Sequence, residues 1–98
     1  MKIIWSPLAA ERATEIADYI AFDNPKAAQD WIDTIFKKIE TLKSSLKLGR
    51  VVPETEREEV REILYRNYRI IYHLSVQKIS ILTIRHGKQI LPVEEILA

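Results

Sequence analysis

The sequence contains no cysteine, two glycines, two histidines and one methionine. Without cysteine, the chain has neither a disulfide nor a thiolate ligand for a metal ion. Two glycines are too few for a glycine-rich loop that cradles phosphate, and the histidines, His73 and His86, lack the spacing of a zinc-binding pair. No serine lies in a nucleophile-elbow context. The inventory predicts no metal and no cofactor, and it leaves cofactor-free acid–base catalysis open.

Long hydrophobic runs are absent as well. No stretch approaches the roughly 20 apolar residues needed to cross a bilayer, and no basic segment followed by an apolar run marks a signal peptide. We therefore expect a cytoplasmic protein without membrane contact. The 98 residues, of which 47% are hydrophobic, suffice for one core and are too few for two, which predicts a single domain over residues 1–98.

The N-terminal half has the pattern of a short strand followed by two helices. The strand is expected at residues 2–5, and Ser6-Pro7 and Asn24-Pro25 each combine an N-cap residue with a proline suited to the first helical position. Because Asp23 and Asn24 alone separate the helices, we expect an antiparallel hairpin. The apolar residues at helical spacing are Ala9, Ala13, Ile16, Ala17 and Ile20, then Ala28, Trp31, Ile32, Ile35, Ile39 and Leu42. Aromatic residues, Phe36 among them, are also expected in the core.

The C-terminal half changes from a helical period to a period of two. Residues 49–59 include a proline and an acidic run and are expected to form an exposed loop. The runs VREILYRN, YRIIYHLS and KISILTIR predict three antiparallel strands. The face packed on the helices is expected to carry Tyr68, Ile70, Tyr72 and Leu74. In the last run, alternation places Ile79 and Ile81 on one face and Leu82 and Ile84 on the other, as in a central strand whose second neighbour is the N-terminal strand.

These elements predict the α+β class with the order β-α-α-β-β-β. A helical hairpin packs on a mostly antiparallel sheet in this arrangement.

The formal charge of +1 conceals an uneven distribution. No acidic residue occurs between Ile63 and Val93, and the basic residues of this interval are Arg66, Arg69, Lys78, Arg85 and Lys88. Arg61, Arg69 and Arg85 fall in or at the end of neighbouring predicted strands, and His86 and Lys88 follow the last one. Such a group predicts a basic sheet face that binds phosphate or an acidic peptide. The alternative is that each arginine reaches solvent separately or pairs with the acids of residues 54–62.

Four segments, in this order and spacing, resemble the RelE/ParE superfamily of bacterial toxins from toxin–antitoxin modules: WSPLAAERATEIADYIAFDNPKAAQDWI, GRVVPE, VREILYRNYRIIYHL and ILTIRHGKQ. The likeness extends from Ile4 to about Gln89. It implies the fold predicted above and an antitoxin partner, whose acidic, partly disordered segment wraps the toxin and folds on binding. It also implies one of two targets. RelE-like members cut messenger RNA in the ribosome, whereas ParE-like members poison DNA gyrase and are not known as catalysts.

The matched positions favour the ParE-like branch. RelE-like ribonucleases carry a lysine pair where this chain has Arg61 and Glu62, and an arginine where it has Gln89. They also carry a tyrosine in a C-terminal helix, and no tyrosine follows Tyr72 here. A site without these groups would stabilise a pentavalent phosphate poorly. We therefore expect a toxin that inhibits gyrase by direct binding. The residues expected to bind the target or the antitoxin are Arg61, Arg69, Arg85, His86 and Lys88.

Two alternatives stay open. Some ribonucleases of the superfamily use a C-terminal histidine as general acid with a nearby glutamate as base. That reading would assign catalytic roles to Glu54, Arg69 and His86, and it would make the ribosome and messenger RNA the partners. The second alternative is a degenerate, non-toxic protein retained as an antitoxin-binding scaffold.

Overall fold

The structure is a computed structural model, and it describes residues 1–87 and 92–97. Its elements are β1 (Lys2–Trp5), α1 (Pro7–Asp23), α2 (Pro25–Thr41), β2 (Arg50–Val51), β3 (Val60–Tyr65), β4 (Tyr68–Leu74), β5 (Lys78–His86) and α3 (Val93–Leu97). Over the described ranges, none of the helices has the length and apolar character that crossing a membrane requires.

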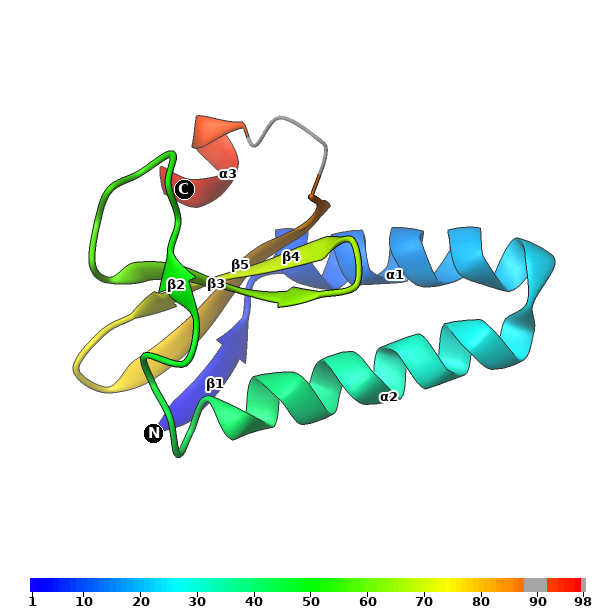
Figure 1. Ribbon diagram of the computed structural model, residues 1–98, viewed down its shortest axis with the longest axis horizontal. Coiled ribbons are helices and arrows are strands. Elements are labelled where there is room, and N and C mark those ends of the chain that lie inside the picture. Colours follow the sequence, from blue (N-terminus) through cyan, green and yellow to red (C-terminus); the bar gives the residue numbers. More distant parts are fainter. Residues whose placement is uncertain (88–91, 98) are drawn as a thin grey trace.

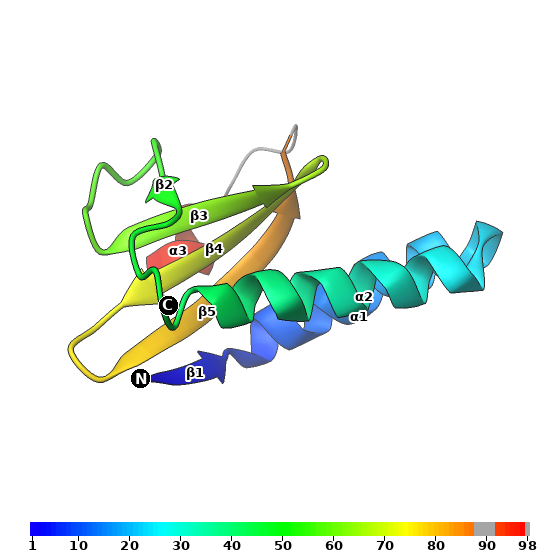
Figure 2. The same cartoon turned by 60° about the horizontal axis from the view of Figure 1, so that its bottom comes forward.

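Five strands form one sheet in the order β1-β5-β4-β3-β2. β1 runs parallel to β5, and the other neighbours are antiparallel. Figures 1 and 2 show α1 and α2 against one face, called the inner face below, and α3 against the opposite, outer face. The far end of the helical hairpin extends beyond the sheet. The predicted α+β class, the hairpin and the N-terminal strand beside the last strand are confirmed.

Both long helices begin at the predicted caps. Ser6 Oγ accepts a bond from the backbone N–H of Ala9 at 2.9 Å and donates one to the carbonyl of Leu82 at 2.8 Å. Asn24 Oδ1 accepts a bond from the backbone N–H of Ala27 at 3.1 Å. Each cap satisfies an N–H that lacks an intrahelical partner. The Ser6 cap also fixes the start of α1 against β5.

Two hydrophobic cores lie on the two faces of the sheet. The inner core is formed by residues of the hairpin and the sheet, among them Trp31, Ile35, Ile39, Leu42, Ile63, Ile70, Tyr72, Ile79, Ile81 and Ile84. The smaller outer core contains Val52, Val60, Ile71 and Ile96. Fully burying one such aliphatic side chain contributes about 1.5–3 kcal/mol. The inner core therefore fixes the hairpin on the sheet, and the outer core fixes α3 and the loop that contains Val52.

The structure corrects the prediction that residues 49–59 form only a loop. A two-residue strand, β2, pairs with β3 through Arg50 opposite Glu62 and Val51 opposite Arg61. Two residues carry too little periodicity to be recognised as a strand in a sequence.

The predicted face of Ile84 was wrong because β5 contains a bulge. The register passes from Ile71 opposite Thr83 to Tyr72 opposite Ile81, so Leu82 is an extra residue. An inserted residue reverses the alternation of side chains beyond it. Ile84 therefore joins Ile81 in the inner core, and Leu82 packs on the outer core.

Phe36 was also placed wrongly by the core prediction. Its side chain contacts the ring of Trp5, with centroids 5.2 Å apart, but Phe36 remains 53% exposed. It lies beside the buried stripe of α2 and not within it.

Candidate functional site

Arg69 lies in the middle of β4 on the outer face, where it is bound by two carboxylates. Its Nη1 and Nη2 donate to the two oxygens of Glu54 at 2.9 and 2.8 Å, and its Nε donates to Glu62 at 2.6 Å. The Glu62 side chain is completely buried and also accepts a bond from Arg50 at 2.6 Å. We call these four residues the outer-face network. It joins β4 and β3 to β2 and to the segment that contains Glu54.

The electrostatics of the outer-face network favour its charged form. The hydrogen bond from Arg69 is the main cause that lowers the pKa of Glu54 below its ordinary value, and it outweighs the opposing effect of burial. The pKa of Arg69 is raised, chiefly by its hydrogen bonds to Glu54 and also by its hydrogen bond to Glu62, against the opposing effect of burial. Each partner thus stabilises the ionised state of the other. The side chain of Arg69 is 8% exposed, and its charge is neutralised inside the chain.

Arg61 lies on the opposite side of the sheet from Arg69. It pairs in register with Tyr72 of the inner core, while its neighbour Glu62 points to the outer face. Its guanidinium donates to the carbonyl of Gly49 at 2.9 Å, and to the carbonyl and the carboxylate of Glu58 at 3.0 and 3.1 Å. The expectation that Arg61 and Arg69 share one face was wrong, because adjacent positions of paired strands alternate between faces.

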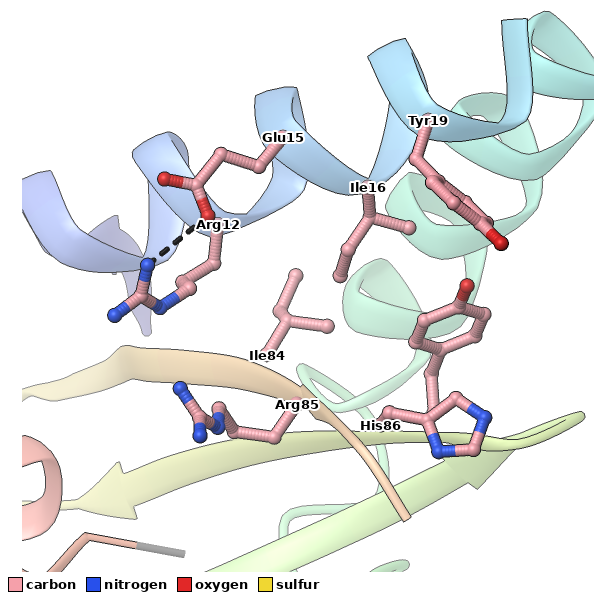
Figure 3. Close-up of a pocket in the computed structure, with 8 residues that line it drawn as sticks. Arg12, Glu15, Ile16, Tyr19, Ile84, Arg85 and His86 are labelled. Atoms are coloured by element: carbon pink, nitrogen blue, oxygen red, sulfur yellow. Dashed lines mark hydrogen bonds and ion pairs between the residues drawn. The ribbon is translucent and has the colours of Figure 1, made fainter. Parts of the chain in front are cut away.

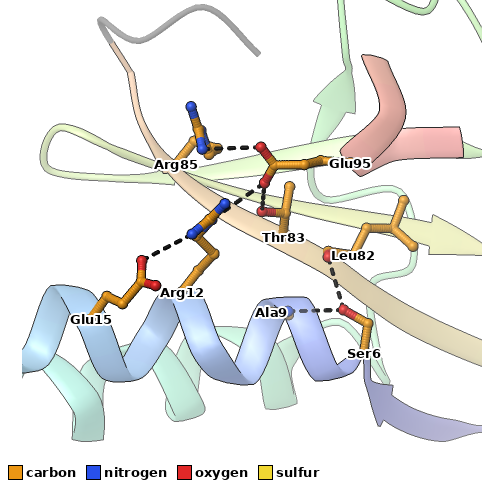
Figure 4. Close-up of polar contacts among 8 residues, drawn as sticks. All are labelled: Ser6, Ala9, Arg12, Glu15, Leu82, Thr83, Arg85 and Glu95. Atoms are coloured by element: carbon orange, nitrogen blue, oxygen red, sulfur yellow. Dashed lines mark hydrogen bonds and ion pairs between the residues drawn. The ribbon is translucent and has the colours of Figure 1, made fainter. Parts of the chain in front are cut away.

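Arg85 lies beside Arg69 on β5, as the predicted basic face requires. Its Nη1 donates to Glu95 of α3 at 3.0 Å, and Glu95 also accepts bonds from Thr83 at 2.9 Å and from Arg12 of α1 at 3.4 Å (Figure 4). One carboxylate thus joins α1, β5 and α3. Arg12 has a second acidic neighbour, Glu15, at 3.0 Å, and the bond to Glu15 is the main cause that raises the pKa of Arg12.

His86 points to the inner face at the end of β5. Its ring makes an edge contact with Tyr68, with centroids 5.6 Å apart. Both rings line a groove of 530 Å³ between α1 and β5 (Figure 3). The other residues of this groove are Arg12, Glu15, Ile16, Tyr19, Ile84 and Arg85. The pKa of Tyr68 is raised, mainly by burial and then by the nearby Tyr19.

The structure separates the residues of the alternative acid–base pair. Glu54 is bound to Arg69 on the outer face, whereas His86 contacts Tyr68 and the α1 groove on the inner face. A general acid and a general base must reach the same substrate within hydrogen-bond distance. The sheet lies between these two side chains. Within residues 1–87 and 92–97, no three acidic or histidine side chains gather in a way that could hold a metal ion.

The predicted binding residues therefore fall into separate places. Arg61 and Arg69 pair with acids of residues 54–62, which was the alternative to a basic face, and Arg85 pairs with Glu95. Lys88 lies outside the described residues. Sequence reasoning missed the roles of Glu62 and Glu95 as internal counter-ions. The alternation that puts Arg69 outward on β4 also puts Glu62 outward on β3, and this signal could have revealed the first pair.

Positive charge that is not ion-paired lies elsewhere on the part of the chain that the structure describes. The lysines and arginine outside any ion pair there are Lys2, Lys37, Lys38, Lys47, Arg66 and Lys78. Two of them, Lys38 and Arg66, lie against the same ring, that of Tyr65.

Comparison with known proteins agrees with the fold described above. A structure described as the chromosomal ParDE TA system from P. aeruginosa contains a chain with a TM-score of 0.73 and 24% identity, over 90% of this chain and 97% of that one. No curated protein matches. The family model for the ParE toxin of type II toxin–antitoxin systems, parDE, matches residues 3–91. The resemblance to the ParE-like branch is thereby confirmed, and the chain belongs to the ParE toxin family of type II toxin–antitoxin systems.

Proposed function

We propose that this ParE toxin inhibits DNA gyrase by direct binding and is neutralised by an acidic antitoxin. The observation that carries the choice between binding and catalysis is the position of Glu54 and His86 on opposite faces of the sheet. Glu54 is also fully engaged by Arg69. Among the described residues, the acid–base pair of a ribonuclease is therefore not assembled.

Family membership supports the antitoxin partner, since these toxins belong to two-component modules. An acidic, partly disordered segment would be attracted by the lysines and the arginine outside ion pairs and would order on binding. The residues predicted to touch a partner contribute to this proposal in different ways. Arg61 and Arg69 hold the sheet together, whereas Arg85 and His86 lie at the end of β5 and line the α1 groove.

Two assays of the purified protein test the proposal. A gyrase inhibitor stops ATP-dependent supercoiling of relaxed plasmid, or it traps cleaved DNA, and the cognate antitoxin relieves the effect. If gyrase is untouched while messenger RNA is cut on ribosomes, the ribonuclease reading replaces this one. If neither activity is found and expression causes no growth arrest, the chain is a scaffold that binds the antitoxin without poisoning a target.

The variant His86→Ala separates binding from catalysis in whichever assay is positive. A catalyst loses about 10²–10⁴-fold in rate when its general acid is removed. A binder loses no more than the few kcal/mol of one contact, which a higher toxin concentration overcomes. Phe22→Ala serves as the control, because Phe22 is 91% exposed on α1 and lies outside the predicted site.

A further inference from the structure

Two cations surround Tyr65 at the turn between β3 and β4. Lys38 Nζ lies 5.4 Å from the centroid of the Tyr65 ring, and Arg66 Cζ lies 5.5 Å from it. Arg66 Nε donates to the Tyr65 hydroxyl at 3.1 Å. Neither cation has an acidic partner among the residues that the structure describes. The positive charge at this turn is therefore not neutralised, in contrast to that of Arg61, Arg69 and Arg85.

A cleft of 300 Å³ lies directly beside this turn. The cleft lies between the helical hairpin and the end of the sheet. Its lining residues are Ile20, Ala27, Asp30, Trp31, Tyr65, Arg66 and Tyr68. The only acid of the lining, Asp30, is bonded to Lys26 at 3.2 Å. Apolar groups from α1 and α2 thus face a rim that carries positive charge.

Trp31 is 4% exposed, and its indole Nε1 has no acceptor among the described residues. The indole N–H is only a donor, so it requires an acceptor. Leaving such a buried donor unsatisfied costs about 1–3 kcal/mol, and native structures keep few of them. The same nitrogen is shielded from solvent, and the Trp31 ring makes an edge contact with Tyr68, with centroids 5.4 Å apart, so the indole N–H is a buried reporter at the wall of the cleft.

Arg66 itself adopts a backbone conformation that arginine rarely adopts, with φ of 54°. The left-handed region costs a residue with a side chain about 1–2 kcal/mol, and glycine or asparagine normally occupies such a turn position. Strained backbone positions cluster at binding and active sites, and the strain at Arg66 points to a use for its side chain.

We propose that this cleft is a docking site for a carboxylate side chain of an acidic peptide segment. The Arg66 guanidinium donates to the carboxylate, Lys38 beside the Tyr65 ring adds positive charge, and Ile20 and Ala27 face the apolar part of the peptide. Arg66 at the cleft and the nearby Lys38 are cations outside ion pairs among the described residues, and Asp30 of the lining is bonded to Lys26, so the complementary ligand is an anion with an apolar stem. Only the source of the segment, an antitoxin, rests on the proposed function.

The test follows the indole N–H signals of the full-length protein by NMR, with a synthetic acetylated peptide AELEA and its neutral counterpart AQLQA as probes. The chain has two tryptophans, Trp5 and Trp31, and the Trp5→Phe variant assigns their signals. AELEA is expected to shift the Trp31 signal saturably and to bind at least about tenfold more tightly than AQLQA, since a charge-assisted pair is worth more than 1.4 kcal/mol.

Arg66→Gly separates docking from folding. Glycine adopts the positive φ without strain, so the melting temperature is expected to stay the same or rise, while the affinity for AELEA falls about tenfold. Lys78→Ala is the matched control, because Lys78 is another exposed cation outside any ion pair at the opposite end of the sheet, in the β4–β5 turn region (Figure 1).

An unmoved indole signal, equal binding of the two peptides, or full affinity in Arg66→Gly would show that the cleft holds water only and would overturn the proposal. Preferential binding of a single-stranded oligonucleotide over AELEA would overturn it as well. These measurements involve neither gyrase nor the antitoxin, so their failure is distinct from a failure of the proposed function.

Discussion

Arg66 and Arg69 lie three residues apart, yet Arg69 is ion-paired inside the fold and Arg66 is outside any ion pair among the described residues. Arg69 is buried in the outer-face network with Glu54 and Glu62, at distances of 2.6 to 2.9 Å. Arg66 is exposed at a strained turn, where it donates to the Tyr65 hydroxyl and, among the described residues, has no acidic partner. The first arginine holds elements together, and the second remains available to a partner.

The difference shows why an acid-free stretch of sequence does not locate a basic surface. Residues 63–93 carry no acid, but carboxylates from outside this interval fold onto it. Glu54 and Glu62 neutralise Arg69, and Glu95 reaches Arg85. Among the described residues, Lys38 and Arg66 at the β3–β4 turn lie outside any ion pair.

The largest effect is expected from Arg69→Ala. This change leaves the completely buried Glu62 with Arg50 as the remaining one of its two cations, and breaking a buried pair from one side costs up to about 3–5 kcal/mol. Urea unfolding followed by far-UV circular dichroism measures the loss. A loss below about 1 kcal/mol would show that Arg69 is as dispensable for the fold as Arg66.

The double variant Arg69→Ala, Glu62→Gln provides the control for that experiment. Removing the buried charge together with its partner should recover part of the lost stability, because in Arg69→Ala the buried carboxylate of Glu62 keeps one of its two cations, Arg50. If the two losses simply add, the network is not coupled as its geometry indicates.

Gly49→Ala is expected to have the next largest effect. A Cβ at this position would lie 2.7 Å from the Tyr72 hydroxyl oxygen and 2.8 Å from the backbone carbon of Glu62. The neighbouring contacts, a bond from the Gly49 N–H to Tyr72 at 3.0 Å and the bond from Arg61, leave no room to shift. Overpacking of this kind costs about 1–3 kcal/mol. Thermal unfolding measures this loss of stability. An unchanged melting temperature would mean that the backbone around Gly49 can shift to accommodate the added methyl group.

The sequence was sufficient for the parts of the fold that depend on local chemistry. The caps at Ser6 and Asn24, the buried stripe of α2 and the three long strand runs all follow from residue type and period. The bulge at Leu82 and the strand β2 depend on pairing between distant segments. No local sequence pattern predicts the bulge or β2, and the bulge alone moves Ile84 to the other face of the sheet.

The candidate site was less predictable than the fold for a related reason. The sequence shows which residues carry charge, but the partner of each charge depends on register and on where loops fold. Arg61 and Arg69 differ by an even number of positions, yet they point to opposite faces because a turn reverses the chain between them. Counter-ions such as Glu95 come from an element of five residues.

Glu54→Gln is expected to have a moderate and pH-dependent effect. The folded-state pKa of Glu54 is lowered by Arg69, so its contribution is complete above the ordinary glutamate pKa of about 4.3 and is lost as the pH falls through the lower folded value. Because the side chain is 37% exposed, the loss at pH 7 should be about 1 kcal/mol at most. Urea unfolding between about pH 3 and 7 should show a flatter decline for the variant. Parallel curves would remove Glu54 from the network's energetics.

The smallest effect on stability is expected from Lys38→Ala. Like Arg69→Ala, this change removes one positive charge, but Lys38 is not ion-paired within the described part of the chain, whereas Arg69 is buried between two carboxylates. Lys38 lies over the Tyr65 ring outside any ion pair, so stability should change by no more than about 0.5 kcal/mol. The pKa of Tyr65 is lowered, first by the Arg66 hydrogen bond and last by the charge of Lys38, so the variant should raise this pKa slightly toward its ordinary value. Ultraviolet titration of the tyrosines, with Tyr65→Phe to identify the signal, measures the change. A stability loss comparable to that of Arg69→Ala would mean that the cations at the β3–β4 turn stabilise the fold, and that partner binding is not their main role.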